Sequence, residues 1–234
     1  MRAAVVVFPG SNCDRDVIHA LRTTVSADTE TLWYESSDLP KNIDLIVLPG
    51  GFSYGDYLRC GAMAARTPVM KAIRRFAEKG GLVLGICNGF QVLTESRLLP
   101  GAILANQSLT FICRSCTVRV ERTDTPFTLG CRENQVLEMP IAHHEGLYFL
   151  PDEEISRLKK EKRVVFRYCG PDGELDDSHN PNGSLDNIAG IVNERGNVMG
   201  LMPHPERASE KILGSDDGTL IWNSLRIWLE KGGR

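Results

Sequence analysis

The chain has 234 residues, of which 42% are hydrophobic and 24% charged, a composition that is typical of folded globular proteins and excludes wholesale disorder. With 27 basic and 30 acidic residues the formal net charge is −3, which leaves no excess of positive charge to hold a nucleic-acid backbone. The apolar runs are far shorter than the roughly 20 residues of a membrane span, and seven cysteines are too few for a disulfide framework, so we expect a cytoplasmic protein with reduced thiols and with neither membrane nor nucleic acid as a partner.

Predicted strands alternate with predicted helices in the first hundred residues. The apolar runs and the helical spacing place strands at residues 3–8, 29–34, 43–48 and 82–86, and helices at residues 15–23 and 69–77. This alternation predicts an α/β fold with a mostly parallel sheet and helices on both faces. In such sheets the active groups lie beyond the carboxyl ends of the strands.

The pattern changes after Pro100-Gly101. The later predicted elements are strands at 111–120, 164–168, 188–192 and 198–202, a charged stretch at 152–162 that is typical of a solvated face or helix surface, and an amphipathic helix at 220–229. We interpret the middle strands as an additional smaller β region and not as a separate domain. The whole chain, residues 1–234, is then expected to form a single domain.

The stretch from Leu82 to Gln91 joins a buried-type strand to an apolar helix through Gly85-x-Cys87-x-Gly89. This is the spacing of a nucleophile elbow, with cysteine in place of serine. The flanking positions lack side chains so that the sharp turn can close and a substrate can approach. The helix that begins there offers free N–H groups that favour a thiolate and can bind an oxyanion. The alternative is a buried structural cysteine at a tight turn.

A cysteine nucleophile needs a base, and the base needs a group that orients it. His204 follows the last predicted strand and lies between Pro203 and Pro205, which make the loop stiff. In extended backbone, residues i and i+2 project to the same side, so Glu206 can reach His204. The sequence therefore predicts a triad of Cys87, His204 and Glu206, against the alternative of a proline-rich surface turn.

Gly50 and Gly51 follow another predicted strand. Two glycines there expose backbone N–H groups, as the second half of an oxyanion hole requires. A phosphate-binding loop and an ordinary tight turn are the alternatives, although the lysine and spacing of a P-loop are missing.

A metal site is the remaining possibility for the adjacent His143 and His144 and for Cys113-x-x-Cys116. The zinc pattern is incomplete, because no second CxxC or HxxxH occurs, and residues 113 and 116 lie in a predicted strand where their odd spacing turns them to opposite faces. We therefore predict no metal. His19 and His179 are interpreted as ordinary helix and loop residues.

Together these motifs resemble the class I glutamine amidotransferases. More closely, the chain is similar to the glutaminase subunits of phosphoribosylformylglycinamidine synthase, a purine-pathway enzyme. The matching segments span nearly the whole chain and are residues 8–14, 49–61, 85–93, 106–113, 142–146 and 202–207. The elbow and His-x-Glu fit any class I member, whereas GGFSYGDYLRCGA and FPGSNCD narrow the resemblance. His144 replaces the glycine expected in the family's His-Gly-Glu-Gly.

The resemblance implies a flavodoxin-like fold, a single glutamine amidotransferase type 1 domain over residues 1–234, and a set of site residues. By matching position these are Cys87 as nucleophile, His204 as general base and acid, Glu206 as its orienter, and Asn88, Gly50, Gly51 and Gln91 as oxyanion-binding or substrate-binding residues. No cofactor is expected in this chain, which lacks a P-loop.

The resemblance also implies an activity and partners. The chain would hydrolyse glutamine and deliver ammonia to a larger synthetase, which uses ATP and Mg to convert formylglycinamide ribonucleotide to formylglycinamidine ribonucleotide, with a small third subunit in the complex. The alternatives are the glutaminase subunit of another class I amidotransferase, a stand-alone cysteine hydrolase, and a catalytically silent scaffold subunit.

Overall fold

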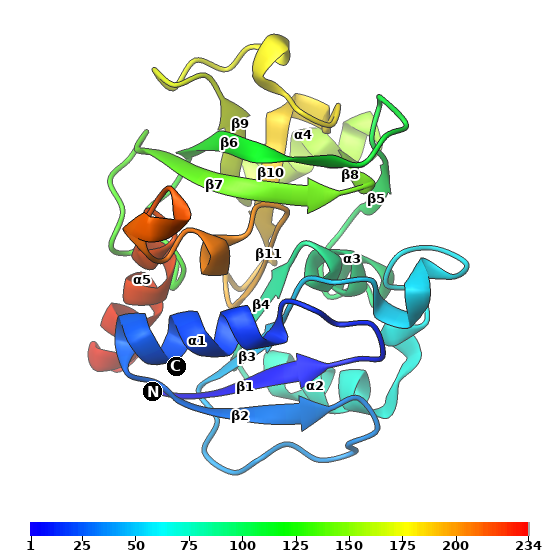
Figure 1. The fold of residues 1–234 in the computed structure, drawn as a ribbon, viewed down its shortest axis with the longest axis vertical. Coiled ribbons are helices and arrows are strands. Elements are labelled where there is room, and N and C mark those ends of the chain that lie inside the picture. The colour runs from blue at the N-terminus through cyan, green and yellow to red at the C-terminus, as the bar shows by residue number, and fades with distance from the viewer. Residues whose placement is uncertain (234) are drawn as a thin grey trace.

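The structure, a computed structural model, describes residues 1–233, and its centre is a nine-stranded sheet (Figure 1). In sheet order the strands are β2 (Asp28–Trp33), β1 (Arg2–Val7), β3 (Leu45–Leu48), β4 (Leu82–Ile86), β11 (Val198–Leu201), β10 (Ile188–Val192), β9 (Val164–Cys169), β6 (Ile112–Val120) and β7 (Val136–His143). Pairing is parallel from β2 to β11 and antiparallel from β11 to β7. The predicted α/β class is therefore confirmed.

Helices cover both faces of the parallel half. The α-helices of the described chain are α1 (Asp14–Val25), α2 (Pro68–Glu78), α3 (Asn88–Glu95), α4 (Asp152–Lys160) and α5 (Thr219–Glu230), of which α4 lies beside the antiparallel half. The chain leaves β1 toward β2 on one side and β3 toward β4 on the other, so right-handed crossovers put α1 and α2 on opposite faces. Figure 1 shows α1 in front of the sheet and α2 behind it. Every residue of β3 and β4 is buried, as expected for parallel strands covered on both faces.

The predicted β region after Pro100 does not stand apart from the main sheet. The strands expected at 111–120, 164–168 and 188–192 extend the sheet in antiparallel pairing. A separate two-stranded antiparallel sheet is formed by β5 (Ala102–Ala105) and β8 (Glu145–Phe149). The sequence did not predict β5, β7 or β8.

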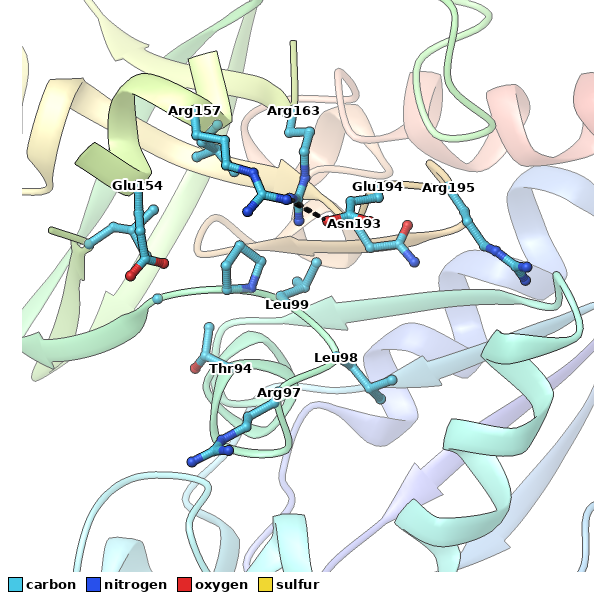
Figure 2. Close-up of a pocket in the computed structure, with 14 residues that line it drawn as sticks. Thr94, Arg97, Leu98, Leu99, Glu154, Arg157, Arg163, Asn193, Glu194 and Arg195 are labelled. Atoms are coloured by element: carbon cyan, nitrogen blue, oxygen red, sulfur yellow. Dashed lines mark hydrogen bonds and ion pairs between the residues drawn. The ribbon is translucent and has the colours of Figure 1, made fainter. Parts of the chain in front are cut away.

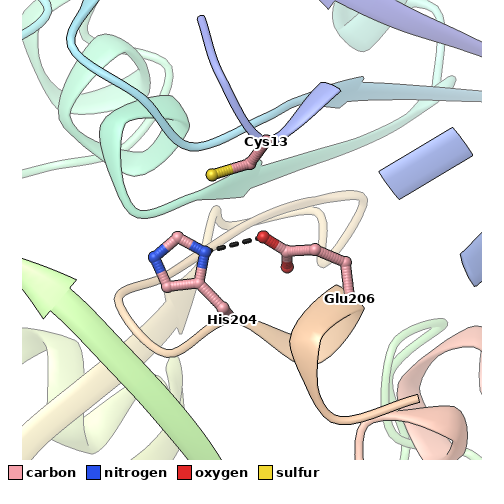
Figure 3. A group of neighbouring side chains, drawn as sticks. All are labelled: Cys13, His204 and Glu206. Carbon is pink, nitrogen blue, oxygen red and sulfur yellow. Dashed lines mark hydrogen bonds and ion pairs between the residues drawn. The ribbon is translucent and has the colours of Figure 1, made fainter. Parts of the chain in front are cut away.

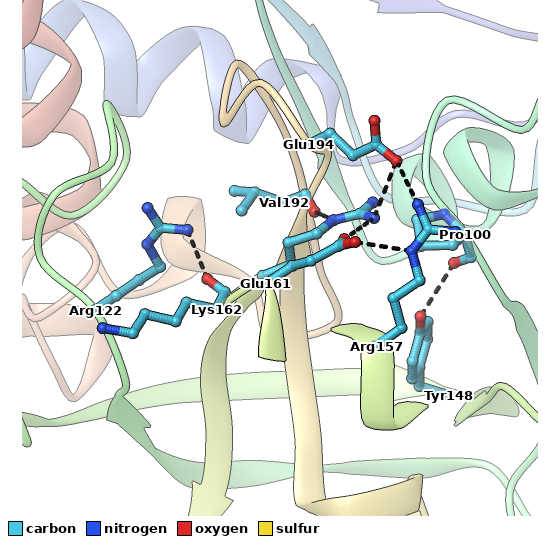
Figure 4. Close-up of polar contacts among 9 residues, drawn as sticks. Pro100, Arg122, Tyr148, Arg157, Glu161, Lys162, Val192 and Glu194 are labelled. Atoms are coloured by element: carbon cyan, nitrogen blue, oxygen red, sulfur yellow. Dashed lines mark hydrogen bonds and ion pairs between the residues drawn. The ribbon is translucent and has the colours of Figure 1, made fainter. Parts of the chain in front are cut away.

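The charged stretch forms α4, of which Leu158 is the one buried residue. Arg157 on α4 donates to Glu161 at 2.7 Å and to Glu194 in the β10–β11 turn at 3.2 Å (Figure 4). Arg163 also donates to Glu161, at 3.2 Å. The stretch is thus a solvated helix surface, as predicted, and its charges tie the helix to a neighbouring turn.

Two loops meet at one edge of the sheet because β4 and β11 are parallel neighbours. Leu201 lies opposite Ile86, so the segments that follow both strands leave the sheet at the same edge. Cys87 follows β4, and residues 202–207 follow β11. Within residues 1–233, the structure contains no helix with both the length and the apolarity that a membrane span requires.

Candidate active site

Cys87 occupies the sharp turn between β4 and α3 with φ 50° and ψ −105°, a backbone conformation that residues other than glycine rarely adopt. The two flanking glycines are sterically required. A Cβ atom on Gly85 would lie 2.6 Å from the carbonyl oxygen of Gly89, and one on Gly89 would lie 1.9 Å from the carbonyl oxygen of Leu48. The turn therefore has the geometry of a nucleophile elbow, and it places the thiol at the N-terminus of α3.

His204 and Glu206 form a buried pair beside this elbow. Nδ1 of His204 lies 2.6 Å from Oε1 of Glu206, and the two residues are 1% and 3% exposed. Glu206 reaches the ring from a short 3₁₀ helix, Pro205–Arg207, and not from extended backbone. The predicted contact between the two side chains is present, and it leaves Nε2 of His204 without a hydrogen-bond partner in the part of the chain that the structure describes.

The pKa of His204 is raised well above its ordinary value. Burial acts in the opposite direction, but it is outweighed by the negative charge of Glu206 and by the nearby thiols of Cys87 and Cys13. The ring is therefore held as an imidazolium at neutral pH. An imidazolium next to the elbow stabilises a thiolate, which is the nucleophilic form of cysteine.

The outer edge of β7 lies over the pair. The backbone N–H of His204 donates to the carbonyl oxygen of Pro140 at 2.9 Å. Two residues further along β7, the carbonyl oxygen of Ala142 lies 3.7 Å from Sγ of Cys87. One strand that the sequence did not predict thus contacts both His204 and Cys87.

The double glycine after β3 packs against the base. A Cβ atom on Gly50 would lie 2.7 Å from Cε1 of His204, and Gly51 has a φ of +145°. The carbonyl oxygen of Gly50 accepts the backbone N–H groups of Asn12 and Cys13 at 3.4 and 3.3 Å. The loop is therefore fixed beside the triad, where its N–H groups are available for the predicted oxyanion role.

Asn88 and Gln91 connect the elbow helix to its surroundings. Nδ2 of Asn88 donates to Oε1 of Gln91 at 2.7 Å, and Oδ1 of Asn88 accepts the backbone N–H of Ser53 at 3.2 Å. Nε2 of Gln91 donates to the carbonyl oxygen of Glu145 at 2.7 Å. Both side-chain amide ends of Gln91 are occupied, so its substrate-binding role stays a prediction.

Cys13 and Arg207 also reach the site, which the residue patterns alone did not predict. Figure 3 shows the Cys13 thiol next to the His204 ring and Glu206, and donor atoms of the three lie within 4.8 Å of one another. Nη2 of Arg207 donates to Sγ of Cys13 at 2.9 Å. A guanidinium directed at the thiol disfavours a second cation there, although the three residue types are metal ligands.

The other histidines and cysteines are dispersed. Cys113 and Cys116 lie in β6, with Cys113 exposed and Cys116 half-buried, as their odd spacing predicts. His19 lies on α1 and contacts Glu210 at the surface. His143, in contrast, ends β7 and is buried near the triad.

The triad is closed to solvent. Cys87 is only 4% exposed, like its two partners. A cavity of about 620 Å³ lies at the opposite edge of the sheet, between the end of α3, α4 and the β10–β11 turn, and is lined by arginines that include Arg97, Arg157 and Arg195 (Figure 2). None of the residues that line this cavity belongs to the predicted triad.

Comparisons with known proteins agree along the whole chain. Residues 1–224 match the family model described as CobB/CobQ-like glutamine amidotransferase domain. A protein of Rhodopseudomonas palustris named phosphoribosylformylglycinamidine synthase subunit PurQ is 54% identical over 231 residues, covering 99% of both chains. A protein of Koribacter versatilis with the same name is 56% identical over 225 residues, covering 96% of this chain and 97% of its own.

A solved structure agrees with these relatives. A chain in the structure described as PurLQS from Thermotoga maritima superposes with a TM-score of 0.87 and is 45% identical, covering 97% of this chain and 98% of its own. The likeness therefore extends over the fold as well as the sequence.

Proposed function

The chain belongs to the CobB/CobQ-like glutamine amidotransferase family, and from this membership we infer that it is the glutaminase subunit of phosphoribosylformylglycinamidine synthase. The observation that carries the inference is the 54% identity over 99% of both chains to a relative of that name. The chain hydrolyses glutamine to glutamate and ammonia. A partner synthetase uses the ammonia and ATP to convert formylglycinamide ribonucleotide to formylglycinamidine ribonucleotide in purine biosynthesis.

The partners follow from the same likeness. The Thermotoga maritima structure is named for three components, PurL, PurQ and PurS, and this chain corresponds to its PurQ-like member. We therefore assign the chain a synthetase and a small third subunit as partners. ATP and Mg belong to the synthetase in this proposal, with no cofactor on this chain, and the complex is cytoplasmic, where both glutamine and ATP are supplied.

The chemistry that we propose for the site begins with the Cys87 thiolate. It attacks the carboxamide carbon of glutamine, forming a C–S bond while the carbonyl oxygen becomes an oxyanion. N–H groups at Asn88 and at the Gly50-Gly51 loop hold this oxyanion. His204 gives its proton to the nitrogen, the C–N bond breaks, and ammonia leaves a thioester behind.

Water completes the cycle. His204, now neutral, takes a proton from water as the oxygen attacks the thioester, and the C–S bond breaks to release glutamate and the thiolate. The bond from Nδ1 of His204 to Glu206, 2.6 Å long, keeps Nε2 as the atom that exchanges protons. The orientation of the base by Glu206 supports a working triad over a silent scaffold.

The test compares synthesis from glutamine with synthesis from ammonium salts in the reconstituted complex. We expect Cys87→Ala to abolish synthesis from glutamine while synthesis from ammonium salts remains near the wild-type rate, because the synthetase needs ammonia and not the thiol. Cys113→Ala is the matched control, since that thiol is exposed and lies on β6. Glutamine-dependent synthesis that survived in Cys87→Ala would refute the nucleophile, and a wild-type chain that released ammonia without any synthetase effect would favour a stand-alone hydrolase.

A further inference from the structure

His143, the last residue of β7, has a ring that is fixed by its neighbours. The residue is 3% exposed and lies on the same buried face of the strand as Met139 and Ile141. Its ring covers Gly146 so closely that a Cβ atom there would lie 2.1 Å from Cε1 of His143. The side chain therefore has no freedom to rotate in the folded chain.

The hydrogen bonds of Asn106 determine which nitrogen of this ring carries the proton. Asn106 is fully buried, and its Nδ2 donates to the carbonyl oxygens of Thr110 and His143, both at 2.9 Å. Its Oδ1 is left to face Nδ1 of His143 at 2.9 Å. The reverse orientation of the amide would press an oxygen against two carbonyl oxygens. Nδ1 of His143 therefore donates, and in the neutral ring Nε2 has a bare lone pair.

The ring is neutral under working conditions. Burial and the positive charge of His204 lower the pKa of His143 to about 4. Nε2 is consequently an acceptor and not a donor at neutral pH. It is buried and has no hydrogen-bond partner within residues 1–233. A buried acceptor without a partner is costly, so this atom is in need of a donor that the chain does not supply.

The segment around His143 runs along the nucleophile. The carbonyl oxygen of the preceding residue, Ala142, lies 3.7 Å from Sγ of Cys87. Two residues after His143, the carbonyl oxygen of Glu145 accepts Nε2 of Gln91 from the elbow helix at 2.7 Å. The carboxamide of glutamine must approach Sγ of Cys87 for the thiol to attack it, so it comes to lie beside this segment.

We propose that Nε2 of His143 accepts an N–H of the glutamine carboxamide and thereby distinguishes glutamine from glutamate. The inference rests on the proposed function. With the carbonyl oxygen in the oxyanion hole, the amide nitrogen lies on the side of His204. Holding one N–H there turns the nitrogen lone pair of the tetrahedral intermediate toward the proton on His204. Glutamate has an oxygen lone pair in place of the N–H, and this lone pair faces that of Nε2 with no proton between them.

The informative variant is His143→Asn in the complex with the synthetase. The asparagine amide can still donate to Oδ1 of Asn106 from the place of Nδ1, but it has no group at the place of Nε2. We expect kcat/KM for glutamine to fall about tenfold or more, as for the loss of one hydrogen bond to a substrate. The ratio of the glutamate inhibition constant to the glutamine KM should decrease by a similar factor, while the rate of ammonia-dependent synthesis is unchanged.

Two further variants separate recognition from structure. His144→Asn makes the same chemical change at the exposed neighbour and should behave as wild type. His143→Gln returns an amide to the place of Nε2 and should regain part of the discrimination. An unchanged ratio of glutamate inhibition to glutamine KM in His143→Asn, even with weaker activity, would overturn the proposal.

The tautomer can be observed directly in the full wild-type chain. ¹⁵N NMR of labelled histidine should show a protonated Nδ1 and a bare Nε2 for His143, and a proton on Nε2 would overturn the proposal. A wild-type complex that makes no product from glutamine would instead refute the proposed function. The two failures are therefore distinguishable.

Discussion

At Gly50, the absence of a side chain leaves room for the ring of His204, the proposed base. A Cβ atom there would lie 2.7 Å from Cε1 of His204, whose ring is buried and bonded to Glu206 and cannot move aside. We expect Gly50→Ala to lower the glutaminase kcat by on the order of 10²-fold, the effect of displacing a catalytic group by about 1 Å. Glutamate production by the complex measures this loss.

The control for this prediction is Gly130→Ala. A Cβ atom at Gly130 would meet Oγ of Ser224 on α5 at 3.2 Å, and its nearest neighbours include no residue of the triad. This variant should keep the wild-type kcat. Equal activities of the two variants would show that Gly50 does not shape the site.

The buried ring of His143 makes the folded chain sensitive to acid. Its pKa is lowered by burial from 6.5 to about 4. In the unfolded chain His143 takes up a proton near pH 6.5, whereas in the folded chain it does so only near pH 4. Acid therefore favours the unfolded chain, and the free energy of unfolding falls as the pH drops from 6.5 to 4. The loss amounts to about 3 kcal/mol, and His143→Asn should not show it.

Urea denaturation of both chains at pH 7 and pH 4.5 measures the difference. The wild-type free energy of unfolding should fall more steeply than that of the variant. An equal fall in the free energy of unfolding of the wild type and of His143→Asn would contradict the lowered pKa of His143.

The triad residues could be predicted because each lies in a short motif of its own. The motif Gly-x-Cys-x-Gly identifies Cys87, and the prolines on both sides of His204 identify the loop that carries His204 and Glu206. Cys13 and Arg207 are 194 residues apart, and their contact at 2.9 Å depends on the packing of α1 against the loop after β11. Their approach to the triad could not be predicted because no local pattern expresses a contact between distant segments.

At the scale of elements, α3 packs directly on the end of β3. A Cβ atom on Gly89 would lie 1.9 Å from the carbonyl oxygen of Leu48, which is backbone and cannot move aside. We expect Gly89→Ala to reduce the free energy of unfolding by about 1–3 kcal/mol, the usual effect of overpacking, because helix and strand must separate. Urea denaturation measures this change, and a stability within error of wild type would contradict the close packing.

The strands that were predicted and those that were missed differ in their surroundings. The runs that form β1, β3 and β4 are nearly continuous and apolar because these strands are covered on both faces. β7 contains Pro140, which weakens a strand prediction but is tolerated because β7 is an edge strand. β5 and β8 pair only with each other, and no residue of β5 is fully buried, so the apolar pattern of this small sheet is weak.

For the whole molecule, the burial of the predicted triad leads us to expect that a partner opens the site. Two loops beside the site carry exposed apolar side chains, and we call this set the mouth patch: Phe52, Tyr57, Leu58, Leu109 and Phe111. Phe52 and Phe111 join the loops, with ring centroids 6.3 Å apart. Exposed apolar clusters of this kind mark interaction surfaces.

We expect the isolated chain to be a poor glutaminase that the synthetase activates by docking on the mouth patch. If the synthetase binds more tightly to a chain whose loops expose Cys87 than to the closed chain, this difference in affinity supplies the free energy for opening the site. The double change Leu58→Ser and Leu109→Ser should weaken this activation by about tenfold or more. Each replacement removes apolar surface that the leucine would bury against the synthetase on docking. Glutamate production across a titration with synthetase measures the effect.

The matched control is Ile212→Ser. Ile212 is 90% exposed but lies in the short helix Lys211–Leu213, outside the mouth patch. It should be activated like wild type. Turnover per Cys87 that stays constant across the titration would exclude activation by the partner.

The place of β11 in the sheet also sets the order in which the enzyme can be built. The central pairing joins β4 to a strand more than a hundred residues later in the chain, after all the antiparallel strands. Contacts of such long sequence separation form late, because the loop between them must first be closed. A growing chain on the ribosome thus carries its thiol long before its base, and it acquires glutamine chemistry only when synthesis is almost finished.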